Sequence, residues 1–439
     1  MTLLNYYAWL ALKSLRRNPV LAALAVLILA LGIAASMTSL TVLHALSADP
    51  LPGRSQRLFV PQFDNGMPQD DGATSEPRLT MTYTEADALL RAGQGQRRTA
   101  LYGVEMTVQP PARGADTLPP FLETGLAAGA DFFPMFDAPF ARGGPWSAEA
   151  DAQGHDVVVL SADFASRVFG NADPLGASIV LQGRPYRVVG VLAPWRPVPR
   201  VYRLGGASPI SPTEAFWIPF RNAIQTERPN SGWTSCSGRR EPGFANFLRA
   251  ECNFLEYWVE LEPAQIAAYQ AHLDAHVAAQ RRGGRMPRSD RAKLTTLPER
   301  AAQFGVVGDD TKLQAGLSLA FLAACLVNVV GLMAARFTAR AGEIGVRRAL
   351  GASRRQVVLQ FLVEAGVVGL AGAALGLLLT AGGLALMAQR SADLAAVARL
   401  DGAMLVLAVG LSLTGALLAA LWPTWRASGV RPAMQLKSQ

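Results

Sequence analysis

The residues best suited to chemistry in this sequence are six arginines in the run from Arg336 to Ala365, with Glu343 as the acid near its centre. They are Arg336, Arg340, Arg347, Arg348, Arg354 and Arg355. Guanidinium groups bind carboxylates through paired hydrogen bonds, so the run predicts a binding site for an acidic surface. A plainer interpretation also stands, because the cytoplasmic loops of membrane proteins are generally rich in arginine.

Helix-ending and helix-starting signals divide this run into two helices. Gly351 fits the glycine that follows a helix, and Ser353 with Gln356 forms an S-x-x-Q capping box that opens the next one. The first helix carries apolar and basic side chains together, namely Ile344, Val346, Leu350, Arg347 and Arg348. A cytoplasmic protein with an acid-lined groove would suit both kinds of side chain.

Common catalytic motifs are absent. The sequence has no G-x-x-x-x-G-K-[ST], G-x-S-x-G, H-E-x-x-H or C-x-x-C pattern. His272 and His276 share a helix face, but the nearby Asp274 points elsewhere, so we expect no metal site. Glu364 could relay protons, although we expect it at the level of the lipid headgroups. We therefore expect neither a catalytic site nor a cofactor bound by this chain.

Four hydrophobic windows without charged residues are long enough to cross a bilayer, which needs about 20 apolar residues. They are Val20–Leu43, Leu313–Ala335, Ala365–Ala388 and Ala403–Trp425. The expected fold is an α-helical membrane protein with four transmembrane helices and a large mixed α+β domain inserted between the first two. The expected segments are an interfacial helix at 1–19, transmembrane helices at 20–44, 313–335, 357–388 and 403–425, the inserted domain at 45–312, a basic loop at 336–356, a short loop at 389–402 and a tail at 426–439.

The net charge of +8 is concentrated beside these windows. Apart from the six arginines above, the flanking basic residues are Lys13, Arg16, Arg17, Arg426, Arg431 and Lys437. Positive charge beside a span marks its cytoplasmic side, so we expect both termini in the cytoplasm and the α+β domain outside the membrane. The basic composition therefore reports topology, and we expect no nucleic-acid partner.

Several short elements of the α+β domain have clear local signals. We expect a helix at Thr84–Arg91 capped by Thr84, a strand at His155–Leu160 and a helix capped by Ser161. We also expect a β-hairpin over 179–192 and an amphipathic helix at Glu262–Arg281.

Residues 194–255 combine tryptophans, prolines and two cysteines and are harder to assign. We predict a loop-rich insertion closed by a Cys236–Cys252 disulfide, which an oxidising compartment permits. Two separate thiols remain the alternative. Cys325 lies in a hydrophobic window and is expected to be a small packing residue.

Small residues in the hydrophobic windows favour close helix packing. Gly372 and Gly376 form a G-x-x-x-G pair, which lets another helix approach closely. Asn328 is expected to bond to a neighbouring helix or to its own backbone, because an unsatisfied amide is costly in hydrocarbon. The spans are thus expected to pack within the protein or against a second copy.

The run EIGVRRALGASRRQVVLQFLVEA resembles the hallmark segment of the MacB/FtsX-type permeases of ABC transporters. The start LKSLRRNPVLAALAVLILALGIAA resembles the same family. So do DFFPMFDAPFARGGPW and VVVLSADFASRVFGNADPLGASIVLQGRPYRVVGVL, which resemble its periplasmic domain. The resemblance covers residues 1–60, 120–192 and 311–439 and leaves out 194–255.

This resemblance implies a permease of the bacterial inner membrane whose basic loop contacts an ABC ATPase. The residues it assigns to that contact are Glu343, Ile344, Gly345, Arg347, Arg348, Leu350 and Gly351. Because the family member MacB carries a fused ATPase ahead of its first span, and only residues 1–19 stand there in this sequence, we expect a separate ATPase subunit that binds ATP and Mg²⁺. A second permease copy or paralogue and membrane lipid are expected partners, and a periplasmic adaptor is a further candidate.

Two functions fit the resemblance. One is a permease that couples ATP hydrolysis to a shape change of the periplasmic domain and so exports or extracts a substrate. The other is an FtsX-like transmembrane relay that activates a periplasmic partner without moving cargo. A membrane sensor that needs no ATPase is a third alternative.

Overall fold

The structure, a computed structural model, describes residues 13, 19–64, 78–111, 118–205, 208–237, 241–286, 291–390, 397 and 402–428. The chain divides into two compact units. Ser47–Val306 forms one of them, which we call the α+β unit. Met1–Leu46 and Val307–Gln439 together form the other, the helical unit.

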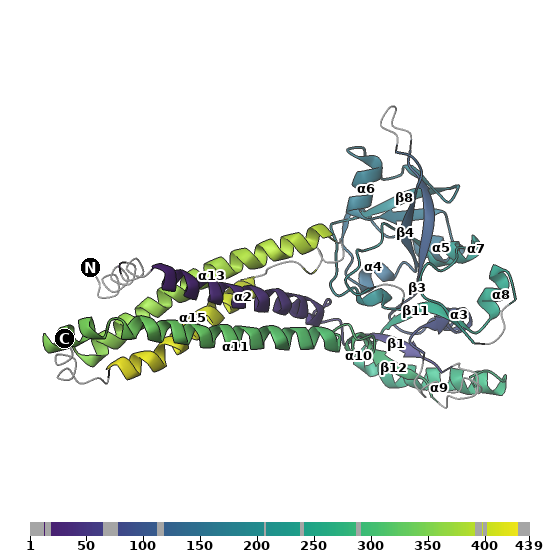
Figure 1. Cartoon of the computed structure of the whole chain (residues 1–439). Helices are drawn as coiled ribbons and strands as arrows, with labels where there is room; N and C mark the ends of the chain where they lie inside the picture. Colours follow the sequence, from purple (N-terminus) through teal and green to yellow (C-terminus); the bar gives the residue numbers. More distant parts are fainter. Residues whose placement is uncertain are drawn as a thin grey trace. The chain divides into compact units, whose positions relative to one another are not determined.

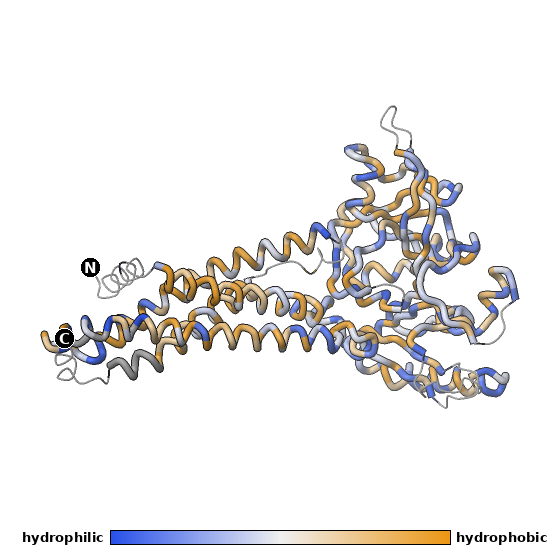
Figure 2. The backbone as a smooth tube through the Cα atoms, in the orientation of Figure 1, coloured by the Kyte–Doolittle hydropathy of each residue, from blue (hydrophilic) through white to orange (hydrophobic). Residues whose placement is uncertain are grey.

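The helical unit is built from long apolar helices. Within the described residues, four helices are long and apolar enough to cross a membrane. They are α2 (Pro19–Ser47), α11 (Asp309–Thr338), α13 (Arg354–Arg390) and α15 (Gly402–Ser428). Figure 2 shows hydrophobic residues following one another along them, and large leucines and valines remain exposed on their surfaces, as a lipid solvent favours.

A short helix, α12 (Ala341–Ala349), joins α11 to α13. The helices α11 and α13 extend past the hydrophobic windows expected from the sequence, because both continue into the charged residues of the basic run. The expected interfacial helix lies outside the described residues apart from Lys13, and so does most of the loop expected at 389–402.

One mixed sheet organises the α+β unit (Figure 1), with the strand order β12-β1-β11-β3-β4-β9-β6-β8-β5 among the described residues. The long strands are β3 (Arg97–Gln109), β4 (Phe121–Ala128), β8 (Arg184–Leu192) and β11 (Cys252–Glu260). The shorter strands are β1 (Leu58–Gln62), β2 (Met81–Thr82), β5 (Phe140–Gly143), β6 (Val157–Leu160), β7 (Ser178–Leu181), β9 (Phe216–Pro219), β10 (Ser235–Cys236) and β12 (Lys293–Thr296).

Both faces of this sheet are buried. Side chains alternate between the faces of a strand, and neighbouring residues here belong to different hydrophobic clusters. In β6, Val158 packs in one cluster and Val159 in the other; in β11, Tyr257 and Trp258 divide in the same way. The strand β6, whose four residues are all apolar and buried, therefore reads as a continuous apolar run rather than an alternating one.

Eight α-helices of the described residues accompany the sheet. They are α3 (Tyr83–Ala92), α4 (Phe132–Met135), α5 (Ala148–Gln153), α6 (Ala162–Phe169), α7 (Phe220–Gln225), α8 (Phe244–Arg249), α9 (Ile266–Arg282) and α10 (Leu297–Gln303). Two short 3₁₀ turns, η2 (Val201–Arg203) and η3 (Pro263–Gln265), complete the set.

Local signals located several of these elements correctly. The amide of Phe164 donates to the Ser161 hydroxyl that caps α6, and β7 and β8 form the expected hairpin. The helix α9 with η3 matches the expected amphipathic helix. The expected cap of α3 was wrong, because Thr82 rather than Thr84 accepts the hydrogen bond from the Glu85 amide.

The prediction for 194–255 was correct in part: most of its described residues lie outside helices and strands, and the Cys236–Cys252 disulfide is present, but the segment is not a separate insertion. This segment supplies β9, which pairs in parallel with β4 inside the sheet, and the first residues of β11. Trp217 of β9 is fully buried. The strand is only four residues long and ends in Pro219, a residue that weakens any strand signal in a sequence.

Candidate functional site

The arginine-rich run folds into a basic hairpin, which we define as residues 336–364: the end of α11, the helix α12 and the start of α13. Gly351 has a φ of +101°, a conformation that glycine adopts without strain. The amide of Ala352 donates to the Arg347 carbonyl, closing α12 with the hydrogen bond of a Schellman motif. The Ser353 amide donates to Gln356 Oε1 (2.9 Å) and the Gln356 amide donates to Ser353 Oγ (3.3 Å), so the capping box is formed.

Arg347 ties α12 to the next helix. Its Nη1 donates to Gln360 Oε1 of α13 at 2.9 Å, and its Nη2 donates to Glu343 Oε1 one turn earlier in α12 at 2.7 Å. This side chain is thus partly committed within the hairpin. Removing the Arg347 side chain would change how α12 is held against α13 as well as any contact with a partner.

Apolar side chains of α12 are open to solvent. Val346 is 56% exposed and Leu350 is 83% exposed. An apolar side chain exposed at the tip of a capped helix, with Arg348 beside it, suits a docking contact better than a solvated surface. Ile344 and Gly345 lie in α12, but their side-chain positions fall outside the described residues.

A buried ion cluster braces the hairpin from within. Arg336 and Glu364 are both fully buried, and Arg336 Nη2 lies 2.5 Å from Glu364 Oε1. Arg340 Nη1 reaches the other carboxylate oxygen of Glu364 at 3.2 Å. The helix α11 and the start of α12 are therefore held to α13 by one carboxylate.

The carboxylate of Glu364 is enclosed by protein, and its expected depth at the level of the lipid headgroups stays a prediction. Sequence reasoning treated it alone and missed the two arginines that neutralise it. The available signal was the spacing: Arg336 and Arg340 lie four residues apart at the end of one hydrophobic window, and Glu364 opens the next. A short connection brings those two ends together.

The glycine pair of α13 lies against α2. A Cβ at Gly372 would stand 2.7 Å from Leu29, and one at Gly376 would stand 2.9 Å from Ile33. Asn328 is exposed on α11 and makes no hydrogen bond to the described part of the chain. Neither of the two bonds considered for it is present, and its packing against a second copy stays a prediction.

Cys325 packs as a small residue within the helical unit. It is buried, and a Cβ at Gly32 of α2 would stand 3.0 Å from the Cys325 Cβ. The pair therefore allows α2 and α11 to approach closely.

The two histidines of α9 have neighbours of their own. His272 Nδ1 lies 3.3 Å from Gln94 Nε2, and the ring of His276 lies against Phe63 with 5.6 Å between centroids.

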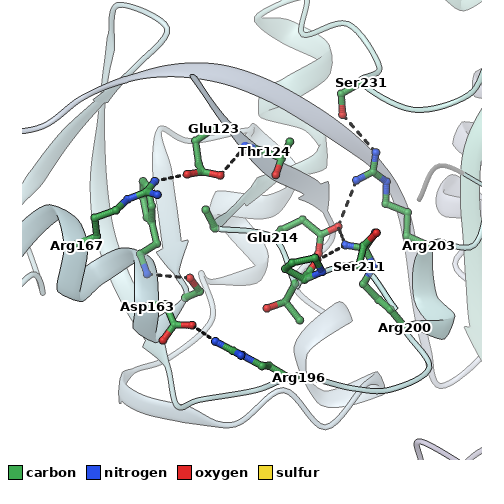
Figure 3. A pocket seen from close by; sticks show the side chains of 15 residues that line it. Glu123, Thr124, Asp163, Arg167, Arg196, Arg200, Arg203, Ser211, Glu214 and Ser231 are labelled. Carbon is green, nitrogen blue, oxygen red and sulfur yellow. Dashed lines mark hydrogen bonds and ion pairs between the residues drawn. The ribbon is translucent and has the colours of Figure 1, made fainter. Parts of the chain in front are cut away.

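A second candidate site lies in the α+β unit (Figure 3). It is a pocket with a volume of about 530 Å³, which we call the arginine pocket. It is bounded by β4, by α6 with its cap Ser161, and by the segment that follows β8. The charged residues that line it are Glu123, Asp163, Arg167, Arg196, Arg200, Arg203 and Glu214. Most of its lining comes from residues 196–231, the stretch for which the sequence suggested no role.

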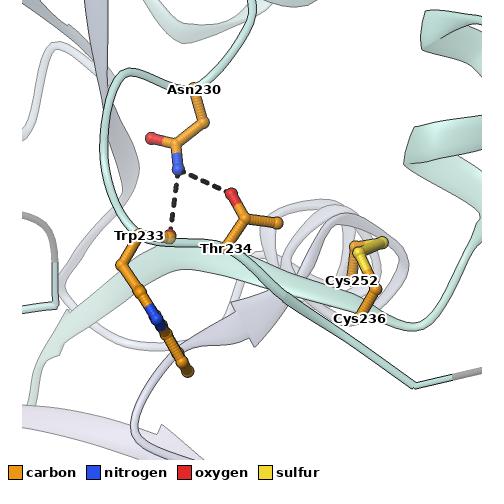
Figure 4. Close-up of a disulfide and its surroundings, with 5 residues drawn as sticks. All are labelled: Asn230, Trp233, Thr234, Cys236 and Cys252. Atoms are coloured by element: carbon orange, nitrogen blue, oxygen red, sulfur yellow. Dashed lines mark hydrogen bonds between the residues drawn. A yellow bond between two sulfur atoms is a disulfide. The ribbon is translucent and has the colours of Figure 1, made fainter.

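Cys236 and Cys252 form a disulfide between the adjacent strands β10 and β11 (Figure 4). The two residues face each other directly in the antiparallel pairing. Beside the disulfide, Asn230 Nδ2 donates to the Trp233 carbonyl and to Thr234 Oγ1, each at 3.0 Å. The strand β10 is thus joined covalently to the sheet.

Comparison with known proteins decides the family. A model of the MacB-like periplasmic core domain matches residues 22–276, more than half of the chain. The chain belongs to the MacB/FtsX-type family of ABC transporter permeases. A second model, the FtsX-like permease C-terminal domain, matches residues 315–432 and so includes the basic hairpin. The first model also spans 194–255, which the resemblance in the sequence had left out.

Two curated relatives of this permease are identical to it at about a quarter of the aligned residues. It is 24% identical over 303 residues to the macrolide export ATP-binding/permease protein MacB of Azoarcus sp. (strain BH72), an alignment covering 69% of this chain and 40% of the relative. It is 25% identical over 235 residues to the uncharacterized ABC transporter permease YknZ of Bacillus subtilis (strain 168), covering 53% and 50%. The chain thus spans half or less of the length of these relatives.

Solved structures that resemble this permease include two external domains. The periplasmic region of MacB from Actinobacillus actinomycetemcomitans is 12% identical, with 56% of this chain and 91% of that chain covered and a TM-score of 0.35. The extracellular domain of the ABC-type transporter YknZ from Gram-positive bacteria is 14% identical, covers 54% and 100%, and has a TM-score of 0.33.

Proposed function

We propose that this chain is the permease subunit of a MacB-like ABC transporter that works with a separate cytoplasmic ATPase. The ATPase binds α12, and ATP and Mg²⁺ are held by that subunit. Its motion is passed through the helical unit to the α+β unit, which changes shape and exports or extracts a substrate at the outer face of the bacterial inner membrane. Both termini lie in the cytoplasm, as the positive charges beside the spans favour.

The observation that carries this proposal is the exposed apolar tip of α12. Leu350 stands 83% exposed on a helix whose end is closed by a Schellman motif, so the tip is ordered rather than frayed. Helix-in-groove binding needs such an apolar anchor, and neighbouring arginines give the charge complementarity that selects an acid-lined partner.

The mounting of α12 supports a mechanical role. Arg347 bonds it to α13 through Gln360, and Glu364 holds both Arg336 and Arg340. A push on α12 is therefore passed to α11 and α13 together instead of being absorbed by a loose loop. The partner permease, a second copy or a paralogue, packs against the exposed faces of the spans, where Asn328 finds a partner across the interface.

Copurification with an ATPase tests the docking surface. The tagged chain, extracted from native membranes in mild detergent, is expected to carry an ABC ATPase identified by mass spectrometry and by ATP hydrolysis. Leu350→Asp is expected to lose it, because an anchor is replaced by a charge of the same sign as the acidic groove. Since Leu350 is exposed, the substitution leaves the fold intact.

A matched control distinguishes docking through α12 from nonspecific hydrophobic adsorption. Trp233 is an exposed apolar residue of the α+β unit, 59% accessible, and Trp233→Ser is expected to keep the ATPase bound. Equal recovery of the ATPase with Leu350→Asp and with the unchanged chain would refute docking through α12. The double change Arg347→Glu with Arg348→Glu is a weaker test, because Arg347 also mounts α12 on α13.

The alternative is an FtsX-like relay that activates a periplasmic partner without moving cargo. The match of 315–432 to the FtsX-like permease C-terminal model favours keeping it. The two functions separate in reconstituted vesicles that contain the permease and its ATPase. Transport predicts ATP-dependent release of a compound from the outer leaflet, whereas a relay predicts ATP-dependent activation of a bound cell-wall hydrolase and no released compound.

A further inference from the structure

The arginine pocket carries more positive than negative side chains. Four arginines and three carboxylates line it. Two of the ion pairs are one-to-one and lie at the rim: Arg167 with Glu123, and Arg196 with Asp163. The arginines of both pairs are about half exposed, so water screens them and they contribute little net field.

The inner wall of the pocket holds two arginines and one carboxylate. Glu214 is shared by Arg200 Nη1 at 3.2 Å and Arg203 Nη1 at 3.3 Å, both to the same oxygen (Figure 3). Its other oxygen accepts the Tyr202 hydroxyl at 2.7 Å. All four side chains are at least nine-tenths buried. Two guanidinium groups therefore face one carboxylate where water is largely excluded.

Glu214 is ionised at neutral pH. Burial raises the pKa of its carboxyl, but the Arg200 and Arg203 guanidinium groups and the Tyr202 hydroxyl outweigh burial, so the pKa lies below its usual value. The inner wall consequently carries one negative and two positive charges. Arg200 Nη1 also donates to the Pro212 carbonyl at 2.7 Å, so Arg203 is the guanidinium better placed to bind an anion in the pocket.

The backbone is shaped to place Arg203 in this wall. A Cβ at Gly103 of β3 would stand 1.7 Å from Arg203 Nη2, so the guanidinium can lie across β3 only because residue 103 is glycine. Arg203 Nη2 then donates to Ser231 Oγ at 3.3 Å. These two hydrogen bonds, to Glu214 and Ser231, use two of the five N–H donors of a guanidinium, and the rest suit an oxyanion.

We propose that the arginine pocket binds a ligand with one oxyanion, a carboxylate or a phosphate, joined to a small apolar body. The oxyanion lies against Arg203 and Arg200, and the apolar body lies against Phe164 and Pro212, which also line the pocket. A volume of about 530 Å³ is of the size that encloses a drug-sized molecule. This site is independent of α12 and does not rest on the transport proposal.

Binding of two matched probes to the full chain in detergent micelles tests this. N-acetylphenylalanine supplies a carboxylate with an aromatic body, and its amide supplies the same body without charge. We expect calorimetry to show the acid binding at least about tenfold more tightly than the amide. Inorganic phosphate distinguishes a phosphate site from a carboxylate site. If phosphate competes with the acid, either oxyanion binds; if it does not compete, the site is specific for a carboxylate.

Arg203→Met removes the guanidinium whose remaining N–H donors suit the oxyanion, so we expect about tenfold weaker binding of the acid. Arg142→Met is the control. Arg142 lies on β5, outside the pocket lining, and forms an exposed ion pair with Asp173. If Arg203→Met does not fold, Arg203→Lys, which keeps the charge but offers fewer N–H donors, is expected to weaken binding about threefold. Equal binding of acid and amide, no binding of either oxyanion, or unchanged affinity in a folded Arg203 variant would overturn the proposal.

Discussion

Glu364 is the residue on which the basic hairpin most depends. It is fully buried, and it neutralises Arg336, which is also fully buried, and Arg340. Buried ion pairs add little stability when compared with apolar residues, but removal of one partner leaves a charge that is expensive to bury. The cluster therefore specifies how α11 and α13 are joined rather than adding to overall stability.

Glu364→Gln is expected to destabilise the helical unit by about 3–5 kcal/mol, because Arg336 is left without its carboxylate. Unfolding of the detergent-solubilised chain, followed by circular dichroism, measures the loss. Glu343→Gln is the matched control: Glu343 pairs with Arg347 at 41% exposure of both side chains, and its removal should cost about 0.5 kcal/mol or less. Similar losses for the two variants would contradict the bracing role of Glu364.

Glu85 makes the α+β unit sensitive to pH. Burial raises the pKa of its carboxyl to about 7, although the Arg285 guanidinium, at 2.5 Å, works in the opposite direction. Arg285 is shared with Glu251 at 2.7 Å, so one cation serves two carboxylates. In the unfolded chain the pKa of Glu85 returns to 4.5. Between these two values the folded state holds a proton that the unfolded state lacks, so stability falls as pH rises through this window.

Glu85→Gln is expected to flatten this dependence. At pH 8 the variant should be more stable than the unchanged chain by about 1–3 kcal/mol, and at pH 4 the two should be nearly equal. Thermal unfolding of the solubilised chain across pH 4–8 gives the profile. Glu149→Gln, at an exposed site in the first turn of α5, should leave the profile unchanged. Parallel profiles for Glu85→Gln and the unchanged chain would show that Glu85 stays ionised in the fold.

At the scale of elements, glycine contacts set the spacing of the long helices. Gly376 of α13 meets Ile33 and the Ala30 carbonyl of α2, whereas Gly382, six residues further along α13, has open space around it. The two positions share one helix and one residue type. They therefore isolate the effect of contact from that of helix propensity.

Gly376→Ala is expected to cost about 1–3 kcal/mol, because its methyl group would stand 3.2 Å from a backbone carbonyl that has little room to move. Gly382→Ala should be neutral or slightly stabilising, since alanine favours helix and nothing lies within 4 Å. Thermal unfolding of both variants in the same detergent supplies the comparison. A loss at Gly382→Ala as large as at Gly376→Ala would mean that α2 does not lie against this face.

Elements with local signals could be predicted from the sequence, and elements that depend on distant partners could not. The break at Gly351 and the capping box at Ser353 need only neighbouring residues, and both are found. The strand β9 has four residues and no pattern of its own; its place beside β4 is decided by the packing of Trp217.

The same distinction divides the two candidate sites. The arginines of α12 stand together in the sequence, so the basic hairpin was visible there. The arginine pocket was not, because Glu123, Arg167 and Arg203 come from β4, α6 and η2 and meet only when the sheet has formed. Ion pairs between such distant residues leave no periodic signal in the chain.

At the scale of the whole molecule, the proposed function requires that ATP turnover by a partner depends on this chain. A family of permeases that contain MacB-like and FtsX-like domains gives the context. In the proposed function, the exposed tip of α12 is the contact with the ATPase, and the ion cluster at Glu364 links that contact to the spans. If the ATPase bound this chain but its ATP hydrolysis did not depend on it, the chain would only attach the ATPase to the membrane.

The most direct test is the rate of ATP hydrolysis by the partner ATPase, measured alone and with the permease reconstituted in lipid nanodiscs. We predict that the permease changes the rate several-fold, that Leu350→Asp abolishes the change by preventing binding, and that Glu364→Gln reduces it while the ATPase stays bound. Trp233→Ser should behave like the unchanged chain. A hydrolysis rate that is the same with and without the permease, in a complex shown to be intact, would contradict the account.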